Sequence, residues 1–135
     1  MEKSKTCCII GGTNKKTDTD NPQEQFMWWT KGEILRLYRQ GVRTFLCGMA
    51  AGTETGAAEA VLALRDGTLP DLRLAGVLAW EERTNDWSES DRDRFFAVME
   101  RCDEEIMLQT TYTEGALERQ REYLLQNSEY RLIVE

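Results

Sequence analysis

The sequence alternates five short apolar runs with four longer stretches of helical spacing, and this alternation constrains the fold more than any other feature. No hairpin turn signal joins neighbouring runs, so consecutive strands are predicted to be linked by helices. Strand–helix–strand connections are right-handed in nearly all proteins, and each lays its helix on the sheet. The pattern therefore predicts an α/β fold with a five-stranded, mainly parallel sheet between two layers of helices.

The expected elements follow from the hydrophobic period and the capping signals. Asn21 is predicted to cap the first helix and Ser88 the third. An open sheet leaves a strand at each edge, so a homo-oligomer, most simply a dimer, is expected to cover these edges. The strands are predicted at residues 6–10, 43–47, 72–79, 105–108 and 130–134, and the helices at about 22–40, 54–65, 89–101 and 113–126. In the last helix, the side chains expected to face inward are Leu117, Leu124 and Leu125.

Composition excludes several classes of function. The chain has 135 residues and no histidine, so Ser-His-Asp catalysis, Cys-His catalysis and histidine-ligated metal sites are excluded. Its net charge of −7 disfavours a protein that coats nucleic acid. The four cysteines form no CxxC pair, and Cys7, Cys8 and Cys47 lie in apolar runs typical of buried free thiols. We expect one cytoplasmic domain over residues 1–135, with no membrane segment, metal or cofactor.

Two glycine-containing segments follow predicted strands, where ligands bind in open parallel sheets. The first is Gly11-Gly12-Thr13. The second spans residues 48–53, and its candidate ligand-binding residues are Gly48, Met49, Ala50, Gly52 and Thr53. Glycine allows backbone N–H groups to approach a ligand closely, and a helix N-terminus favours an anion. The sequence therefore predicts a phosphate at the 48–53 turn; the alternative is that both segments are simply tight turns.

Charged and aromatic side chains near these turns are further candidates. Glu54 is expected either to interact with the helix dipole or to bind a ribose hydroxyl. Glu59 lies among alanines, so we expect an arginine partner, either Arg119 or Arg121. These two arginines are also candidate ligand-binding residues, because such a pair can either lock the site or hold a phosphate. An aromatic ring beyond a strand end can stack on a nucleobase, and the residues placed for this are Trp80, Trp87 and Tyr112.

The segment from residue 48 to residue 59, GMAAGTETGAAE, resembles the signature of the SLOG superfamily in its YpsA/YoqJ-like branch. That branch is related to the DprA and LOG proteins, so the resemblance implies a Rossmann-like three-layer fold. It also implies sensing or sequestration of a ligand, in bacterial stress or phage–host conflict. The positions that carry the resemblance are Phe45, Gly48, Met49, Ala50, Gly52, Ala57, Ala58, Glu59, Trp87, Tyr112 and Thr113.

The sequence departs from this family pattern at four places. Gly11-Gly12-Thr13 replaces a Gly-His-Arg, which removes a cation and an imidazole. Glu54 replaces an aspartate, and Arg119-Gln120-Arg121 only approximates an Arg-Asn pair. Relatives continue beyond the fifth strand, whereas this sequence ends at Glu135. We therefore expect a short SLOG-like domain in which part of the family's ligand pocket is either absent or supplied by a second protomer.

The first functional hypothesis is a module that binds a nucleotide or nucleotide-derived ligand, to sense or sequester it. The alternative from the LOG resemblance is an N-glycosidic nucleotide hydrolase, with Glu54 or Glu59 as the catalytic carboxylate. The chain lacks the Pro-Gly-Gly-x-Gly-Thr motif of those enzymes, which favours a protein that is not an enzyme. Two further alternatives are a DprA-like module that binds nucleic acid, which the charge disfavours, and a dimeric scaffold that binds nothing.

Overall fold

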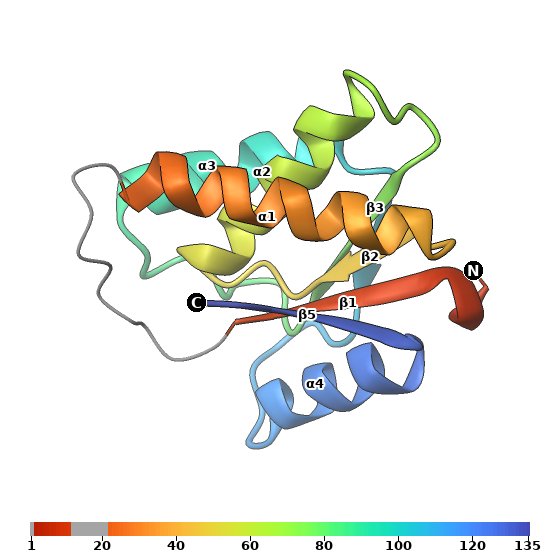
Figure 1. Cartoon of the computed structure of the whole chain (residues 1–135). Helices are drawn as coiled ribbons and strands as arrows, with labels where there is room; N and C mark the ends of the chain where they lie inside the picture. The colour runs from red at the N-terminus through yellow and green to blue at the C-terminus, as the bar shows by residue number, and fades with distance from the viewer. Residues whose placement is uncertain (1, 12–21) are drawn as a thin grey trace.

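The computed structural model describes residues 2–11 and 22–135 (Figure 1). Its strands are β1 (Thr6–Gly11), β2 (Thr44–Cys47), β3 (Arg73–Leu78), β4 (Glu104–Met107) and β5 (Tyr130–Val134). Its helices are α1 (Pro22–Arg39), α2 (Thr53–Arg65), α3 (Glu89–Arg101) and α4 (Ala116–Gln126), and a short 3-10 helix, Lys3–Lys5, precedes β1. Most observed bounds lie within two residues of those predicted, and those of α3 and β5 agree fully.

All neighbouring strands run parallel, in the order β4-β3-β2-β1-β5. The chain steps across the sheet in one direction from β1 to β4, and it then returns to place β5 beside β1. A right-handed crossover puts its helix on opposite faces for these two directions of travel. Accordingly α1, α2 and α3 cover one face and α4 covers the other (Figure 1). The predicted three-layer α/β/α fold is confirmed.

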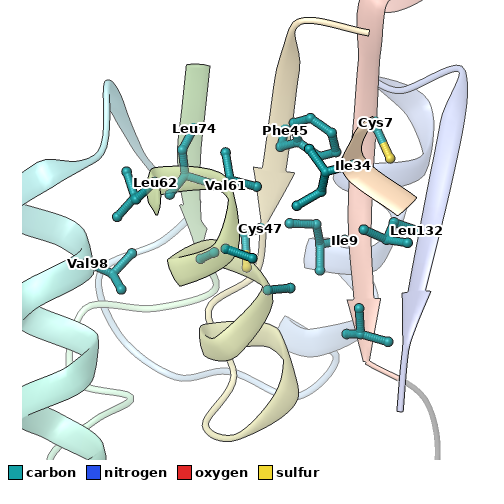
Figure 2. Close-up of a cluster of buried hydrophobic side chains, with 14 of the residues drawn as sticks. Cys7, Ile9, Ile34, Phe45, Cys47, Val61, Leu62, Leu74, Val98 and Leu132 are labelled. Carbon is teal, nitrogen blue, oxygen red and sulfur yellow. The ribbon is translucent and has the colours of Figure 1, made fainter. Parts of the chain in front are cut away.

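The hydrophobic core has two parts, one on each face of the sheet. Successive strand side chains point to opposite faces, so Cys7 and Ile9 of β1 pack under α1–α3, whereas Cys8 packs under α4. The larger part lies beneath the three-helix layer, as Figure 2 shows for side chains of β1, β2, β3 and β5. Cys7, Cys8 and Cys47 are buried free thiols, as predicted.

Two details of the helices test the sequence patterns. Ser88 caps α3, because its Oγ accepts the Asp91 N–H at 3.1 Å, as predicted. In α4, Leu124 is buried but Leu117 is 47% exposed, so the inward placement predicted for Leu117 is wrong. The helix begins at Ala116, after Gly115 with φ +83°, and in its first turn Ala116 is the buried side chain. Asn21 lies outside the described residues.

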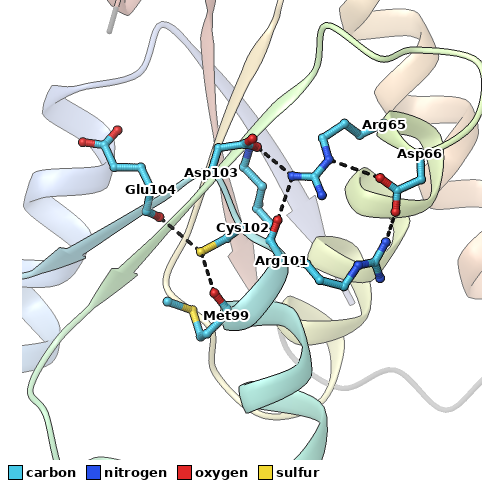
Figure 3. A network of polar contacts seen from close by, with 8 residues as sticks. Arg65, Asp66, Met99, Arg101, Cys102, Asp103 and Glu104 are labelled. Atoms are coloured by element: carbon cyan, nitrogen blue, oxygen red, sulfur yellow. Dashed lines mark hydrogen bonds and ion pairs between the residues drawn. The ribbon is translucent and has the colours of Figure 1, made fainter.

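A polar network ties the ends of α2 and α3 to the beginning of β4 (Figure 3). Arg65 Nη1 donates to Asp103 Oδ2 at 2.9 Å and to the Arg101 carbonyl at 2.8 Å. The same Asp103 oxygen accepts the Leu74 N–H at 2.8 Å, and Arg101 pairs with Asp66. This network therefore links both helices to the amino end of the sheet, opposite the glycine turns.

The open sheet has β4 and β5 as its edges, as expected. The exposed side chains Glu104 and Glu105 make β4 polar, whereas Ile133 leaves β5 with a side chain that is 55% exposed. The homo-oligomer stays a prediction. None of the helices in residues 2–11 and 22–135 has the length and apolar character that crossing a bilayer requires.

Candidate functional site

A cleft of about 300 Å³ opens at the carboxyl end of β1, between the start of α2 and the helix α4. One side is apolar and is formed by Ile10, Leu117 and Leu124. The polar side chains that line it come from three separate parts of the chain: Glu54, Arg83, Glu118, Gln120 and Arg121. The cleft lies where ligands bind in parallel sheets. Of the predicted ligand-binding residues, Gly11, Glu54 and Arg121 line it, whereas residues 48–53 lie beside it and do not.

Glu54 lies at the centre of this cleft. Its Oε2 accepts the backbone N–H of Gly11 at 3.2 Å, and its Oε1 lies 3.4 Å from the N–H of Ala50. The carboxylate thus joins the end of β1 to the turn after β2. A Cβ on Gly11 would lie 2.8 Å from Oε2, and one on Gly48 would lie 3.1 Å from Oε1. Glycine at position 11 therefore lets this carboxylate approach, and glycine at position 48 leaves room for Gln120 Nε2, which a Cβ there would meet at 2.8 Å.

Gln120 of α4 completes the same cluster from the opposite face of the sheet. Its Nε2 donates to the carbonyls of Gly48 at 3.0 Å and Val77 at 2.8 Å. These two carbonyls lie at the carboxyl ends of the neighbouring strands β2 and β3. The Gln120 side chain that binds them is only 7% exposed. Both amide donors are used, so Oε1 remains to accept a hydrogen bond in the cleft. Sequence reasoning missed Gln120 as a site residue; a polar residue on the buried face of α4 was the available signal.

The 48–53 turn leaves the start of α2 without a side-chain cap. The N-cap is Gly52, with φ +92°, and the hydroxyl of Thr53 does not cap the helix. The hydroxyl that bonds to the turn is instead Thr55 Oγ1, which donates to the Ala50 carbonyl at 2.8 Å. Met49 is buried with φ +61°, a conformation that non-glycine residues rarely adopt. Constrained backbone of this kind clusters at functional sites.

Arg83 is the second residue that sequence reasoning missed. It lies in the loop between β3 and α3, and its Nη1 donates to the Gly48 carbonyl at 3.3 Å. Burial lowers the pKa of its guanidinium, while the nearby Glu54 carboxylate acts in the opposite direction. The loop looked merely polar in the sequence, and only the fold brings this arginine back over the end of β2.

The three aromatic candidates lie near the strand ends but do not line the cleft. Trp80 meets Tyr112 edge-on, with ring centroids 5.0 Å apart. Trp87 packs edge-on against Phe95 at 5.8 Å, at the border of the main core. A role for these rings in stacking on a base stays a prediction.

The prediction that Glu59 pairs with Arg119 or Arg121 is wrong. Glu59 pairs with Arg94 of α3, because it lies in the three-helix layer, whereas Arg119 and Arg121 belong to α4 on the other face. Arg119 instead holds the loop before α4, donating to Gln109 Oε1 at 3.1 Å and to Thr113 Oγ1 at 2.6 Å. Arg121 does line the cleft.

Two remaining expectations concern the first loop and metal binding. Gly12 and Thr13 lie outside the described residues, so the first loop contributes only Gly11 to the site geometry. Across the part of the chain that the structure describes, no three His, Cys, Asp or Glu side chains gather where they could hold a metal ion.

The chain has recognisable sequence similarity to known proteins. The sequence model of the YpsA family, described as the YspA SLOG family, matches residues 19–134. A UPF0398 protein of Halalkalibacterium halodurans is 32% identical over 104 residues, which cover 76% of this chain and 54% of that protein. The chain thus spans about half the length of the curated relative it matches.

Proposed function

The chain belongs to the YspA SLOG family, and on that premise we propose that it binds a nucleotide or a nucleotide-derived small molecule in the cleft between α2 and α4. The observation that carries this proposal is the placement of Glu54. Its carboxylate lies at the carboxyl ends of two adjacent parallel strands, against the N–H groups of Gly11 and Ala50, in a cavity large enough for part of a small ligand.

The chemistry of this cluster suits the hydroxyls of a ribose. Each oxygen of an ionised carboxylate has two lone-pair sites, and a single backbone N–H lies near each oxygen of Glu54. One site therefore remains on each oxygen, which matches the two hydroxyls of a vicinal diol. Oε1 of Gln120 adds another acceptor beside it. A ligand that presents hydrogen-bond donors is favoured here.

The phosphate and the base of a nucleotide could each contact groups near Glu54. The uncapped start of α2 at Gly52 presents N–H groups to an anion, which supports the predicted phosphate at the 48–53 turn. The apolar side of the cleft, with Leu117 47% exposed, offers a surface for a base. Binding in this manner accounts for the exposure of a leucine that the helical pattern predicts to face inward.

The test is calorimetric titration and thermal shift with a panel of mono-, di- and cyclic nucleotides. We expect at least one member to stabilise the protein, and Glu54→Gln to lower its affinity at least about tenfold, the effect of losing a charged hydrogen bond. The matched control is Glu59→Gln, on the same helix but paired with Arg94 away from the cleft. Binding by no member of the panel, or equal binding by both variants, contradicts the proposal. Release of a free base from a monophosphate favours the hydrolase alternative.

A further inference from the structure

Arg83 lines the cleft and has no ion pair among the residues that the structure describes. No carboxylate of residues 2–11 or 22–135 forms a salt bridge with its guanidinium. Within the described residues, its guanidinium donates a hydrogen bond from Nη1 to the Gly48 carbonyl, at 3.3 Å. A guanidinium has five N–H donors, so most of its hydrogen-bonding capacity is left for another partner.

Two tryptophans hold this side chain in place. The Arg83 Cζ atom lies 5.7 Å from the ring centroid of Trp80 and 5.9 Å from that of Trp87. Each ring is itself supported by another aromatic residue, Trp80 by Tyr112 and Trp87 by Phe95. Cation–π contacts attract the guanidinium and also restrict its motion. The arginine is therefore oriented before any ligand arrives.

The surroundings of Arg83 favour an anion as its missing partner. Residues 48–59 contain no lysine or arginine, so the turn itself offers a phosphate no cationic side chain. The Glu54 carboxylate raises the pKa of Arg83 but forms no salt bridge with it, and its two oxygens face the N–H groups of Gly11 and Ala50. Arg83 donates to the Gly48 carbonyl, so its positive charge lies beside the 48–53 turn.

We propose that Arg83, held by Trp80 and Trp87, is the anion-binding residue of the cleft and binds the phosphate of the ligand beside the 48–53 turn. This inference rests on the proposed function. A guanidinium fork matches two oxygens of a phosphate, and it forms shorter and stronger hydrogen bonds than a neutral donor. Glu54 repels an anion, so the ligand is oriented with its hydroxyls at Glu54 and its phosphate at Arg83. In this arrangement Trp80 and Trp87 orient the Arg83 guanidinium and do not stack on a nucleobase.

The test compares a nucleoside monophosphate with its nucleoside by calorimetric titration, using the full chain. Arg83→Gln is expected to weaken binding of the monophosphate about tenfold to a hundredfold and to leave the nucleoside within about twofold. Arg83→Lys keeps the charge but loses the fork, so it should fall between Arg83→Gln and wild type. The control is Arg39→Gln, an exposed arginine in the last turn of α1. If Arg83→Gln loses the same affinity for both ligands, or loses affinity for neither, the inference is overturned.

A second measurement separates this inference from the proposed function. Inorganic pyrophosphate probes the anion site without a sugar or a base. Wild-type protein is expected to show a thermal shift with pyrophosphate that Arg83→Gln lacks and Trp80→Leu reduces, at unchanged near-ultraviolet circular dichroism for Arg83→Gln. A pyrophosphate shift that persists in Arg83→Gln places the anion elsewhere and overturns the inference even if nucleotides bind. Absence of nucleotide binding together with an Arg83-dependent pyrophosphate shift contradicts only the proposed function.

Discussion

The carboxylate of Glu54 accepts a hydrogen bond from the backbone N–H of Gly11 over 3.2 Å, and so joins the start of α2 to the end of β1. The two residues are 43 positions apart in the sequence. The parallel sheet brings them together, because β1 and β2 are neighbours and their carboxyl ends lie at the same edge. Around this contact the structure gathers Gln120 from one helix layer and Arg83 from a loop.

Gly11→Ala should displace Glu54 while leaving the fold intact. The added Cβ would lie 2.8 Å from Glu54 Oε2, closer than real Cβ contacts allow, but this oxygen ends a flexible side chain. We expect a loss of about 1 kcal/mol in stability, since one hydrogen bond is disturbed, and a clear loss of nucleotide affinity. Urea denaturation and titration measure the two effects. Gly32→Ala is the control, because a Cβ there meets nothing within 4 Å; equal affinity for both variants contradicts the role given to Glu54.

Gln120→Met should destabilise the protein by about 1–3 kcal/mol, since the buried carbonyls of Gly48 and Val77 both lose their amide donor. Chemical denaturation measures this difference. The control is Gln126→Met, an exposed glutamine in the same helix, which should change stability by no more than about 0.5 kcal/mol. Similar stability of the two variants would show that Gln120 does not join α4 to the strand ends.

Asp103→Ala should lower the free energy of unfolding by about 1–2 kcal/mol, because Oδ2 accepts hydrogen bonds from both the Leu74 N–H and Arg65. Asp103→Asn should cost less, since its amide oxygen still accepts the Leu74 N–H. Raising the salt concentration should narrow the difference between wild type and Asp103→Asn, because salt screens the partly exposed ion pair. Asp93→Ala, on the exposed side of α3, is the control. Equal effects of the two alanine variants would contradict the network of Figure 3.

Stability should fall as the pH rises above about 9. Burial raises the pKa of the Cys7 and Cys47 thiols above their ordinary value of 9.0. Above that pH the unfolded thiols lose protons that the folded ones keep, so the unfolded state is favoured by up to about 1.4 kcal/mol per pH unit for each thiol. Below about pH 8 the thiols stay protonated in both states and contribute no slope. Urea denaturation between pH 7 and pH 10.5 measures this slope of the free energy of unfolding against pH.

Replacement of both Cys7 and Cys47 by alanine gives the control for this pH dependence. The double variant is expected to be less stable at pH 7, because it leaves small cavities in the core, but to show a shallower slope above pH 9. An unchanged slope would assign the loss of stability at high pH to other groups. Thiol labelling at pH 8 should reach Cys102 first, since the other three cysteines are buried.

The sequence by itself determined the order and extent of the elements. The period of apolar residues and the glycine, serine and proline signals act over a few neighbouring residues, so α3, β5 and the glycine turns could be located without a structure. The same pattern predicted the parallel sheet, because the handedness of crossovers is general. It also placed the candidate site at the strand ends, with Glu54 among its residues.

Only the tertiary structure decided which side chains meet. Glu59 pairs with Arg94 rather than with an arginine of α4, because the return from β4 to β5 puts α4 on the opposite face of the sheet. The same placement turns Gln120 toward Gly48 and leaves Leu117 in the cleft. Arg83 reaches the site through a loop whose path no local pattern specifies. These contacts join residues far apart in sequence, and they depend on strand order and on the face that each helix covers, neither of which is encoded in a short window of residues.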